Sequence, residues 1–156
     1  MADIVIDSQH FHTSSNNYEN SYIRSWLNND FYDTAFNIEE KLNIEMTTVD
    51  NSLASTGRET NPYICNDTED NVFLLSYVEA NDESYGLNTT ASRLLGPSDY
   101  AKSQGVIMNE NKSNWWLRTP HFSLAYSGFN VYEGMFNADF VDYTSIGVVP
   151  ALWISL

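Results

Sequence analysis

The fold is decided by the tryptophan-rich stretch Trp115-Trp116-Leu117-Arg118-Thr119-Pro120 together with a later stretch, Gly147-Val148-Val149-Pro150-Ala151-Leu152-Trp153. Tryptophan side chains bury large areas, so paired tryptophans and a late third one favour the interior over the surface. We therefore expect both stretches to be core strands. They would support the segment between them, about 118–147, as an exposed surface. The supporting residues of this frame are Trp115, Trp116, Pro120, Gly147, Pro150 and Trp153.

The segment between the two stretches has an unusual composition. Residues 121–146 contain no lysine, arginine or glutamine and one glutamate, Glu133, although exposed segments normally use these residues freely. Tyrosine, serine, glycine and asparagine are common there, as in the binding loops of antibodies. The candidate ligand-binding residues are Arg118, His121, Phe122, Ser123, Tyr126, Asn130, Tyr132, Phe136, Asn137, Asp139, Asp142 and Tyr143. The competing interpretation is a twisted sheet in which alternate aromatic residues pack inward.

The rest of the chain predicts an α+β fold. Strands are expected at 115–118, 129–132, 140–143 and 147–154, with Gly128 and Gly134 at turns. Upstream, apolar spacing and capping signals predict a strand at 4–6, helices at 21–34 and 38–43, and a buried strand at 72–75. Ser76 and Glu79 have the spacing of a capping box for a short helix, and further helical pieces are expected at 91–95 and 97–103. Residues 47–71 are expected to be mostly irregular loop, with one strand at the start of the segment.

Length and charge limit the classes of partner. The 156 residues fit a single domain, 1–156, with room for a core. A formal charge of −14 would repel the phosphates of nucleic acids and of anionic membranes, so we expect neither as a partner. No run of residues is long enough for a membrane span, and no signal peptide opens the chain; either the protein lacks an export signal or the chain begins after one. The oligomeric state stays open.

Three groups of residues could carry chemistry, and none is specific. His10 and His12 would share one face of a strand, as metal ligands do, but a polar loop is favoured. The acidic residues Asp67, Glu69 and Asp70 could bind calcium, but they lack the glycine turn of a calcium loop, so a solvated loop is favoured and no cofactor is expected. Cys65 has no partner for an internal disulfide. Because no activated nucleophile or phosphate-binding loop is visible, we expect the protein not to be an enzyme.

In chain order, several segments resemble a family of uncharacterised domains common in gut bacteria and their phages. The resemblance is carried by 18–21, 23–24, 26–28, 31–32, 35–36, 72–76, 99–102, 115–120 and 147–153. That family is related to the C-type-lectin-like fold of formylglycine-generating enzymes and of the variable proteins of diversity-generating retroelements. The resemblance implies two N-terminal helices packed on a small antiparallel sheet, with the first and last strands paired and the last sheet displaying loops. Val149 stands where the family usually has arginine, and the family usually begins with additional strands before Met1.

The resemblance also implies a function. Adenine-directed mutagenesis in such retroelements yields a limited set of residues, and 121–146 fits that set except at Glu133 and Met135. Our first hypothesis is a ligand-binding display module, hypervariable and on a virion or cell surface, that recognises a protein or a glycan. The alternative is a structural or assembly domain of a phage particle or cell-surface protein. An enzyme related to formylglycine-generating enzymes is disfavoured, because Cys65 is the only cysteine.

Overall fold

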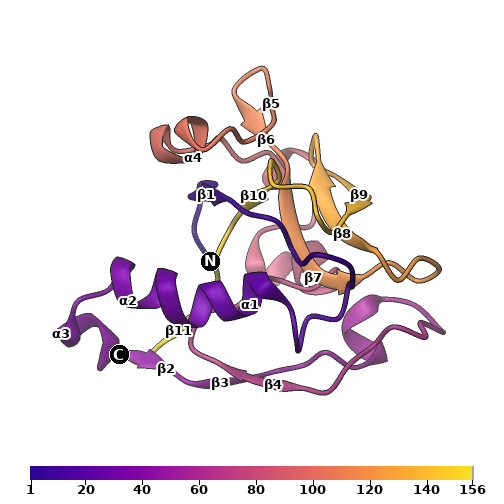
Figure 1. Ribbon diagram of the computed structural model, residues 1–156, viewed down its shortest axis with the longest axis horizontal. Helices are drawn as coiled ribbons and strands as arrows, with labels where there is room; N and C mark the ends of the chain where they lie inside the picture. The colour runs from indigo at the N-terminus through magenta and orange to yellow at the C-terminus, as the bar shows by residue number, and fades with distance from the viewer. Residues whose placement is uncertain (156) are drawn as a thin grey trace.

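The computed structural model describes residues 1–155 and shows a mixed α+β fold built around one five-stranded sheet (Figure 1). The sheet has the order β1-β10-β7-β8-β9, and all neighbours are antiparallel except β10 and β7. Its strands are β1 (Asp7–Ser8), β7 (Trp115–Pro120), β8 (Ser127–Tyr132), β9 (Met135–Phe140) and β10 (Gly147–Val148).

One long helix and one short helix follow the first strand. α1 (Tyr22–Trp26), a π-helical turn (Leu27–Phe31) and α2 (Tyr32–Ala35) run on without a break, close to the predicted 21–34. This helix buries Ile23 and Leu27 in the core. α3 (Ile38–Lys41) begins at the predicted capping box of Asn37 and Glu40, but it buries no side chain. The first helix is therefore anchored in the core, whereas α3, contrary to the expectation, does not pack on the sheet.

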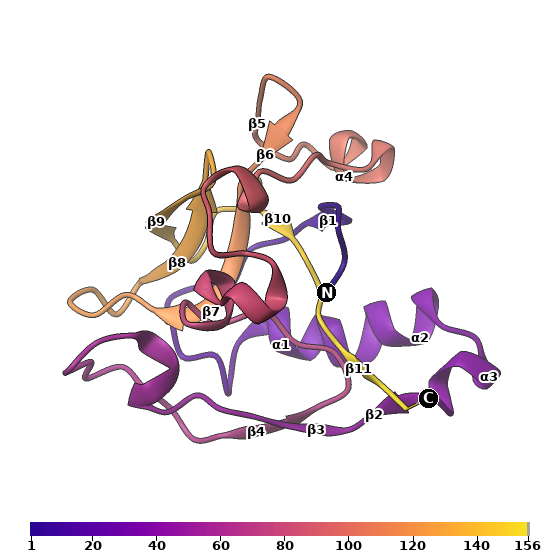
Figure 2. The ribbon, with the colours of Figure 1, turned by 180° about the vertical axis from the view of Figure 1, so that it is seen from behind.

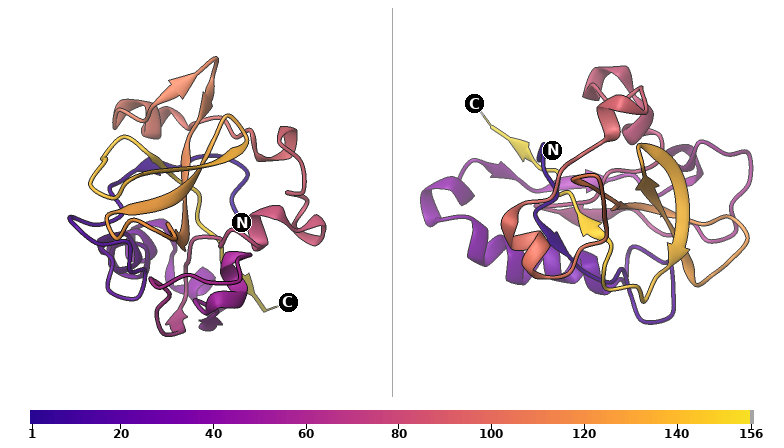
Figure 3. Two further views of the ribbon diagram at one scale, coloured as in Figure 1. Left: turned by 90° about the vertical axis from the view of Figure 1, so that its right-hand side faces the viewer. Right: turned by 90° about the horizontal axis from the view of Figure 1, so that it is seen from above.

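Three two-stranded ribbons and several short helical turns complete the fold (Figures 2 and 3). The ribbons pair β2 (Ile44–Glu45) with β11 (Trp153–Ile154), β3 (Thr47–Val49) with β4 (Thr68–Asp70), and β5 (Met108–Asn109) with β6 (Lys112–Ser113). The turns are Leu53–Thr56, Glu79–Asn81, Glu83–Tyr85 and Ala91–Arg93, and α4 covers Asp99–Ser103. The 47–71 region thus contains a β-ribbon as well as loops. Among residues 1–155 no helix is long and apolar enough to span a bilayer.

Four expected strands differ from the observed ones. The strand expected at 140–143 begins earlier, at Met135, and is β9. It begins there because Glu133 and Gly134, with φ of 51° and 75°, form a two-residue hairpin turn directly before it. The run 147–154 is divided into β10 and β11, and the 72–75 segment is buried but pairs only through a Phe73–Ala151 bridge. The first strand begins at Asp7 rather than at residue 4.

The expected pairing of the first and last strands is present, because β1 pairs with β10 at the start of the expected 147–154 strand, while the end of that run, β11, pairs with β2. One expectation about turns is corrected. Gly128 is not a turn but lies inside β8, where a Cβ would meet the Trp116 ring at 3.5 Å. That distance is an ordinary van der Waals contact, so a small side chain would fit there.

The tryptophan pair lies at the centre of the core. Successive residues of a strand point to opposite faces, so Trp115 and Trp116 fill both sides of the sheet. The Trp115 Nε1 donates to the carbonyl of Arg93 at 3.1 Å, and the Trp116 Nε1 donates to that of Gln9 at 2.9 Å. Trp153, expected to be core, is instead 49% exposed, because the β2–β11 ribbon has no second layer over it.

Candidate binding surface

The segment between the two tryptophan stretches forms an exposed surface at the β9 edge of the main sheet (Figure 3). Its residues come from the loop before β8, from the β8–β9 hairpin and from the loop after β9. We define the display surface as the large apolar side chains that this segment exposes. They are Phe122, Leu124, Tyr126, Tyr132, Met135, Phe140 and Tyr143. Four of the candidate residues, Phe122, Tyr126, Tyr132 and Tyr143, are among them.

Three aromatic residues of the display surface form a cluster. The ring centroids of Tyr126 and Phe140 are 5.8 Å apart, and those of Phe140 and Tyr143 are 5.5 Å apart with the rings edge to face. Their exposed fractions are 50%, 46% and 42%. The Val141 amide donates to the Tyr126 carbonyl at 3.0 Å, and the Tyr143 amide donates to that of Phe140 at 3.1 Å. Backbone hydrogen bonds therefore hold the segments that carry the three rings, and each of the three residues is about half exposed.

A second group joins the display surface to a distant loop. The Arg58 guanidinium lies over the Phe122 ring at 3.7 Å, and His121 stacks against the same ring at 4.5 Å. Partial burial and the nearby Arg58 charge lower the pKa of His121 below its usual range. Every other lysine or arginine within residues 1–155 makes an ion pair or hydrogen bond inside the chain; these residues are Arg24, Lys41, Arg93, Lys102, Lys112 and Arg118.

Arg58 was not among the candidates, since no signal in 57–60 points to the loop before β8. A guanidinium has five N–H donors in a planar fork. Because Arg58 is exposed and its contacts are with aromatic faces, these donors are available to an acceptor on a ligand.

A polar group lies across β8 and β9. The Asp139 carboxylate accepts from the Asn130 Nδ2 at 2.7 Å and from the Asn137 Nδ2 at 3.3 Å through the same oxygen. Asn137 is exposed and Asp139 is partly exposed, so both can meet a ligand. Asn130 has 0% exposure, so its candidate role as a contact residue is wrong; it orients Asp139 from below. Its Oδ1 is buried without a partner.

The comparison with protein families gives one match. A family model described as "Domain of unknown function (DUF6273)" matches residues 1–156. The chain belongs to this family. Neither the search of curated proteins nor the search of solved structures gave a match.

In this DUF6273 domain Arg118 belongs to the frame, and its candidate role in ligand contact is wrong. Its side chain is 2% exposed and forms an ion pair with Glu79. The two guanidinium Nη atoms also donate to the carbonyls of Leu74 at 2.7 Å and Asp50 at 3.0 Å. Glu79 in turn accepts from the Ser76 amide at 2.7 Å, which is the predicted capping box. Arg118 therefore fastens β7 to two loops beneath the display surface.

Phe136 has a supporting position in the DUF6273 domain. It is half-buried, with Tyr77 at 4.2 Å between ring centroids and the Arg93 guanidinium over its ring at 4.4 Å. Ser123 and Asp142 are exposed and stay candidate contacts. The sequence thus identified most of the exposed residues but could not separate them from their supports.

The two histidines near the N-terminus both contact Tyr22. The His10 ring stacks on the Tyr22 ring at 4.1 Å, and the His12 Nδ1 accepts from the Tyr22 amide at 3.2 Å. Partial burial and the nearby His12 lower the pKa of His10, while Asp142 opposes this. Both rings thus help to hold the start of α1.

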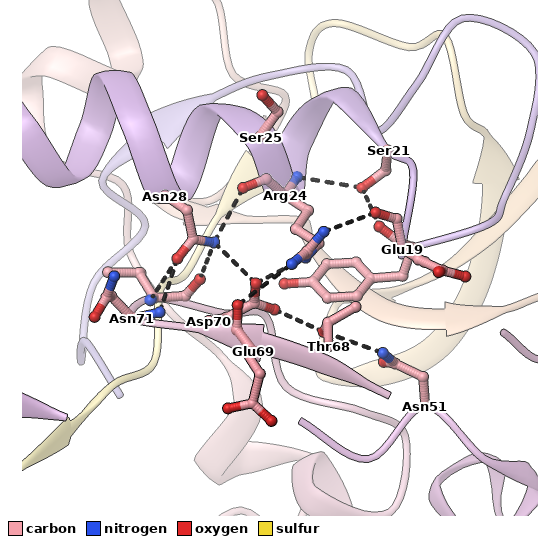
Figure 4. Close-up of polar contacts among 12 residues, drawn as sticks. Glu19, Ser21, Arg24, Ser25, Asn28, Asn51, Thr68, Glu69, Asp70 and Asn71 are labelled. Carbon is pink, nitrogen blue, oxygen red and sulfur yellow. Dashed lines mark hydrogen bonds and ion pairs between the residues drawn. The ribbon is translucent and has the colours of Figure 1, made fainter. Parts of the chain in front are cut away.

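The acidic residues of the DUF6273 domain have separate partners, and Figure 4 shows the contact of Asp70 with Arg24. Asp70 pairs with Arg24 of α1 at 2.7 Å, whereas Asp67 accepts from the Asn51 amide and Glu69 from the Thr48 hydroxyl. Burial raises the pKa of Asp70, although its hydrogen bond from Thr68 and the Arg24 charge oppose the rise. Within residues 1–155 no three His, Cys, Asp or Glu side chains gather in a way that could hold a metal ion.

The same region ties α1 to the chain that leads into the core (Figure 4). The Asn28 Oδ1 accepts from the amides of Asn71 at 2.8 Å and Val72 at 3.1 Å, and its Nδ2 donates to the Val72 carbonyl at 2.8 Å. One side chain therefore satisfies the backbone of a segment that has no neighbouring strand there.

Proposed function

We propose that this DUF6273 domain is a ligand-binding module that recognises a protein or a glycan through the display surface. The observation that carries the proposal is the cluster of Tyr126, Phe140 and Tyr143, whose rings contact one another while each residue is about half exposed. Large exposed apolar patches on soluble proteins commonly mark binding sites. Rings that already contact one another lose less conformational entropy on binding, which leaves more of the contact energy for affinity.

The chemistry of the surface suits a ligand that combines apolar faces with hydroxyl or amide groups. The cluster of Tyr126, Phe140 and Tyr143 offers flat apolar area. Asn137 and Asp139 point to the other face of the hairpin, where they offer a donor and an acceptor on the side that also carries Tyr132 and Met135. Arg58 adds a cationic donor at the Phe122 side. Sugars present apolar C–H faces and hydroxyl groups, and protein surfaces present the same combination through side chains and backbone.

The finer part of the proposal is a C-type-lectin-like arrangement with hypervariable exposed positions. It is supported by the division of the segment into exposed residues and buried ones such as Phe129, Val131, Val141 and Ile146. Sibling sequences would then differ at the exposed positions and keep the buried ones. A near-identical template copy and a reverse transcriptase would accompany the gene, and the protein would act on a virion or cell surface.

The second candidate is a structural or assembly domain whose display surface makes one fixed contact. The exposed aliphatic side chains of Leu124 and Met135 favour it, since they add contact area without hydrogen-bonding groups. Substitutions spread evenly over sibling sequences would support this candidate against the hypervariable one.

The test compares two variants on an array of purified glycans and on a displayed library of protein fragments. The first carries Tyr126→Ser, Phe140→Ser and Tyr143→Ser; the control carries Tyr100→Ser, an exposed tyrosine on α4. We expect the triple variant to lose at least about tenfold in affinity for a retained probe, as hot-spot aromatics do. The control should bind like the wild type. Equal binding by the triple variant, or no retained probe, would overturn the proposal.

A further inference from the structure

A second exposed apolar surface lies at the end of the molecule occupied by α3, β2 and β11 (Figures 1 and 2). We call this region the apolar end, and it consists of Ile38, Leu42, Met46, Trp153 and Ile154. Trp153 and Ile154 are successive strand residues, so they lie on opposite faces of the β2–β11 ribbon. Ile38 and Leu42 are 80% and 81% exposed, more than any other large apolar side chain within residues 1–155. Residues four apart on a helical turn point the same way, so these two side chains stand side by side.

The apolar end is held in place by local contacts. The Asn37 Oδ1 accepts from the Glu39 and Glu40 amides, and the Glu40 carboxylate accepts from the Asn37 amide at 2.8 Å. Lys41 pairs with Asp33 of α2 at 2.7 Å. The exposure of Ile38 and Leu42 therefore belongs to a capped and anchored turn.

The β2–β11 ribbon adds open strand edges to this surface. Ile154 pairs with Ile44 and Trp153 pairs with Glu45. Within residues 1–155 neither strand has another neighbour, so each keeps one unpaired edge. Unpaired edges beside apolar side chains favour the addition of a further segment.

The size of the surface argues for a macromolecular occupant. Ile38, Leu42 and Met46 are 80%, 81% and 66% exposed, which leaves most of their apolar area for a partner to cover. A groove of about 250 Å³ lies on the other side of α3, lined by Phe36, Glu40, Asn43, Ile44, Leu152 and Ile154. That is smaller than the ~300–1,000 Å³ of ordinary small-molecule sites, so it suits one side chain of a larger partner.

The charges around the surface identify the kind of partner. Glu39, Glu40 and Glu45 are exposed at its rim, whereas its lysine, Lys41, is already paired with Asp33. A second copy of the chain would bring the same acidic rim and a further formal charge of −14, which would repel the first copy. We propose that the apolar end docks a protein segment whose apolar side chains are flanked by lysine or arginine. This proposal is independent of the display surface.

The experiment uses a displayed library of random twelve-residue peptides selected on the full chain. Peptides that also bind the Ile38→Ser, Leu42→Ser variant are removed before each round. Because both substituted residues are almost fully exposed, the variant should melt within about 2 °C of the wild type. The matched control carries Tyr132→Ser and Met135→Ser, which lie on the display surface.

The expected result has three parts. Selected peptides carry apolar residues flanked by lysine or arginine, and the best of them binds the Ile38→Ser, Leu42→Ser variant at least tenfold more weakly, with the control unchanged. Replacing the basic residues of that peptide with glutamine weakens binding by a similar factor. Raising the ionic strength from 0.05 to 0.5 M weakens the original peptide more than the glutamine version, because salt screens the attraction.

Three other results would overturn the proposal. Peptides without basic residues would show that charge does not select the occupant. Failure to enrich any peptide would show that the surface docks no such segment. A dimer in sedimentation equilibrium that strengthens with salt and is abolished by Ile38→Ser, Leu42→Ser would make the occupant a second copy of the chain.

Discussion

The display surface and the apolar end lie at opposite ends of the molecule, and both expose large apolar side chains (Figure 1). They differ in chemistry and in support. The display surface is aromatic, carries amide and carboxylate groups, and grows from strands of six residues backed by the buried tryptophan pair. The apolar end is mostly aliphatic and grows from a four-residue helix and two-residue strands.

This difference suggests two kinds of contact. Polar groups beside exposed rings discriminate between ligands, because a mismatched ligand leaves hydrogen-bonding groups unpaired. Aliphatic side chains on short elements gain mainly from being covered, and the acidic rim selects the partner by charge. One end should therefore be supported by the core and the other by local contacts alone.

The largest expected difference in the free energy of unfolding is between alanine variants of two tryptophans, one in the core and one at the apolar end. Trp116→Ala removes a fully buried ring and should lower the free energy of unfolding by about 3–5 kcal/mol, as large core truncations do. Trp153→Ala removes a ring that is half exposed and should cost no more than about 1 kcal/mol. Urea denaturation followed by circular dichroism measures both. Similar losses in the two variants would show that the apolar end is as much a part of the core as the tryptophan pair.

The second expected difference in the free energy of unfolding is between variants that break two different ion pairs. Glu79→Ala leaves the buried Arg118 guanidinium without its carboxylate and should cost about 2–3 kcal/mol, less than the ~3–5 kcal/mol of a fully buried pair because Glu79 is a quarter exposed. Lys41→Ala breaks the exposed pair with Asp33 and should cost less than about 1 kcal/mol. The same denaturation experiment compares them. A loss below 1 kcal/mol in Glu79→Ala would contradict the assignment of Arg118 to the frame.

A smaller effect is expected within the display surface itself. Tyr126 and Phe140 are in contact, so a double-mutant cycle with Tyr126→Ala and Phe140→Ala should give a coupling of about 0.5–1.5 kcal/mol. The pair Leu42→Ala and Phe140→Ala, with one residue at each end, should give a coupling near zero. If Tyr126 and Phe140 prove uncoupled, the rings are not ordered before binding and the proposed function loses its main support.

Some of these features could be predicted from the sequence because their causes are local. The Asn37 capping box, the Ser76–Glu79 pair and the period of the first helix depend on residues a few positions apart. The exposed segment was visible in composition, since 121–146 avoids the residues that ordinary surfaces use. The start of β9 was missed because Glu133 occupies a turn position that asparagine or aspartate usually fills.

Other features depend on contacts between distant parts of the chain. Trp153 was expected in the core because of its size, but burial needs a second layer, and the β2–β11 ribbon has none over it. Asn130 and Arg118 looked like contact residues, yet the register of the sheet and the 72–79 segment cover them. Arg58 reaches Phe122 only because the fold brings two loops together.

The smallest predicted effect concerns the Arg58 contact and the protonation of His121. Burial and then the Arg58 charge lower the pKa of His121, so the folded chain binds this proton less readily than the unfolded chain does. The corresponding stability is present above the usual histidine pKa and is lost as the pH falls through the folded value. Arg58→Gln should raise the pKa of His121 toward its ordinary value, measured by NMR titration of the imidazole, whereas Lys102→Gln on α4 should not change it. An unchanged pKa in Arg58→Gln would place the guanidinium away from His121, and the display surface would then be aromatic and amide alone.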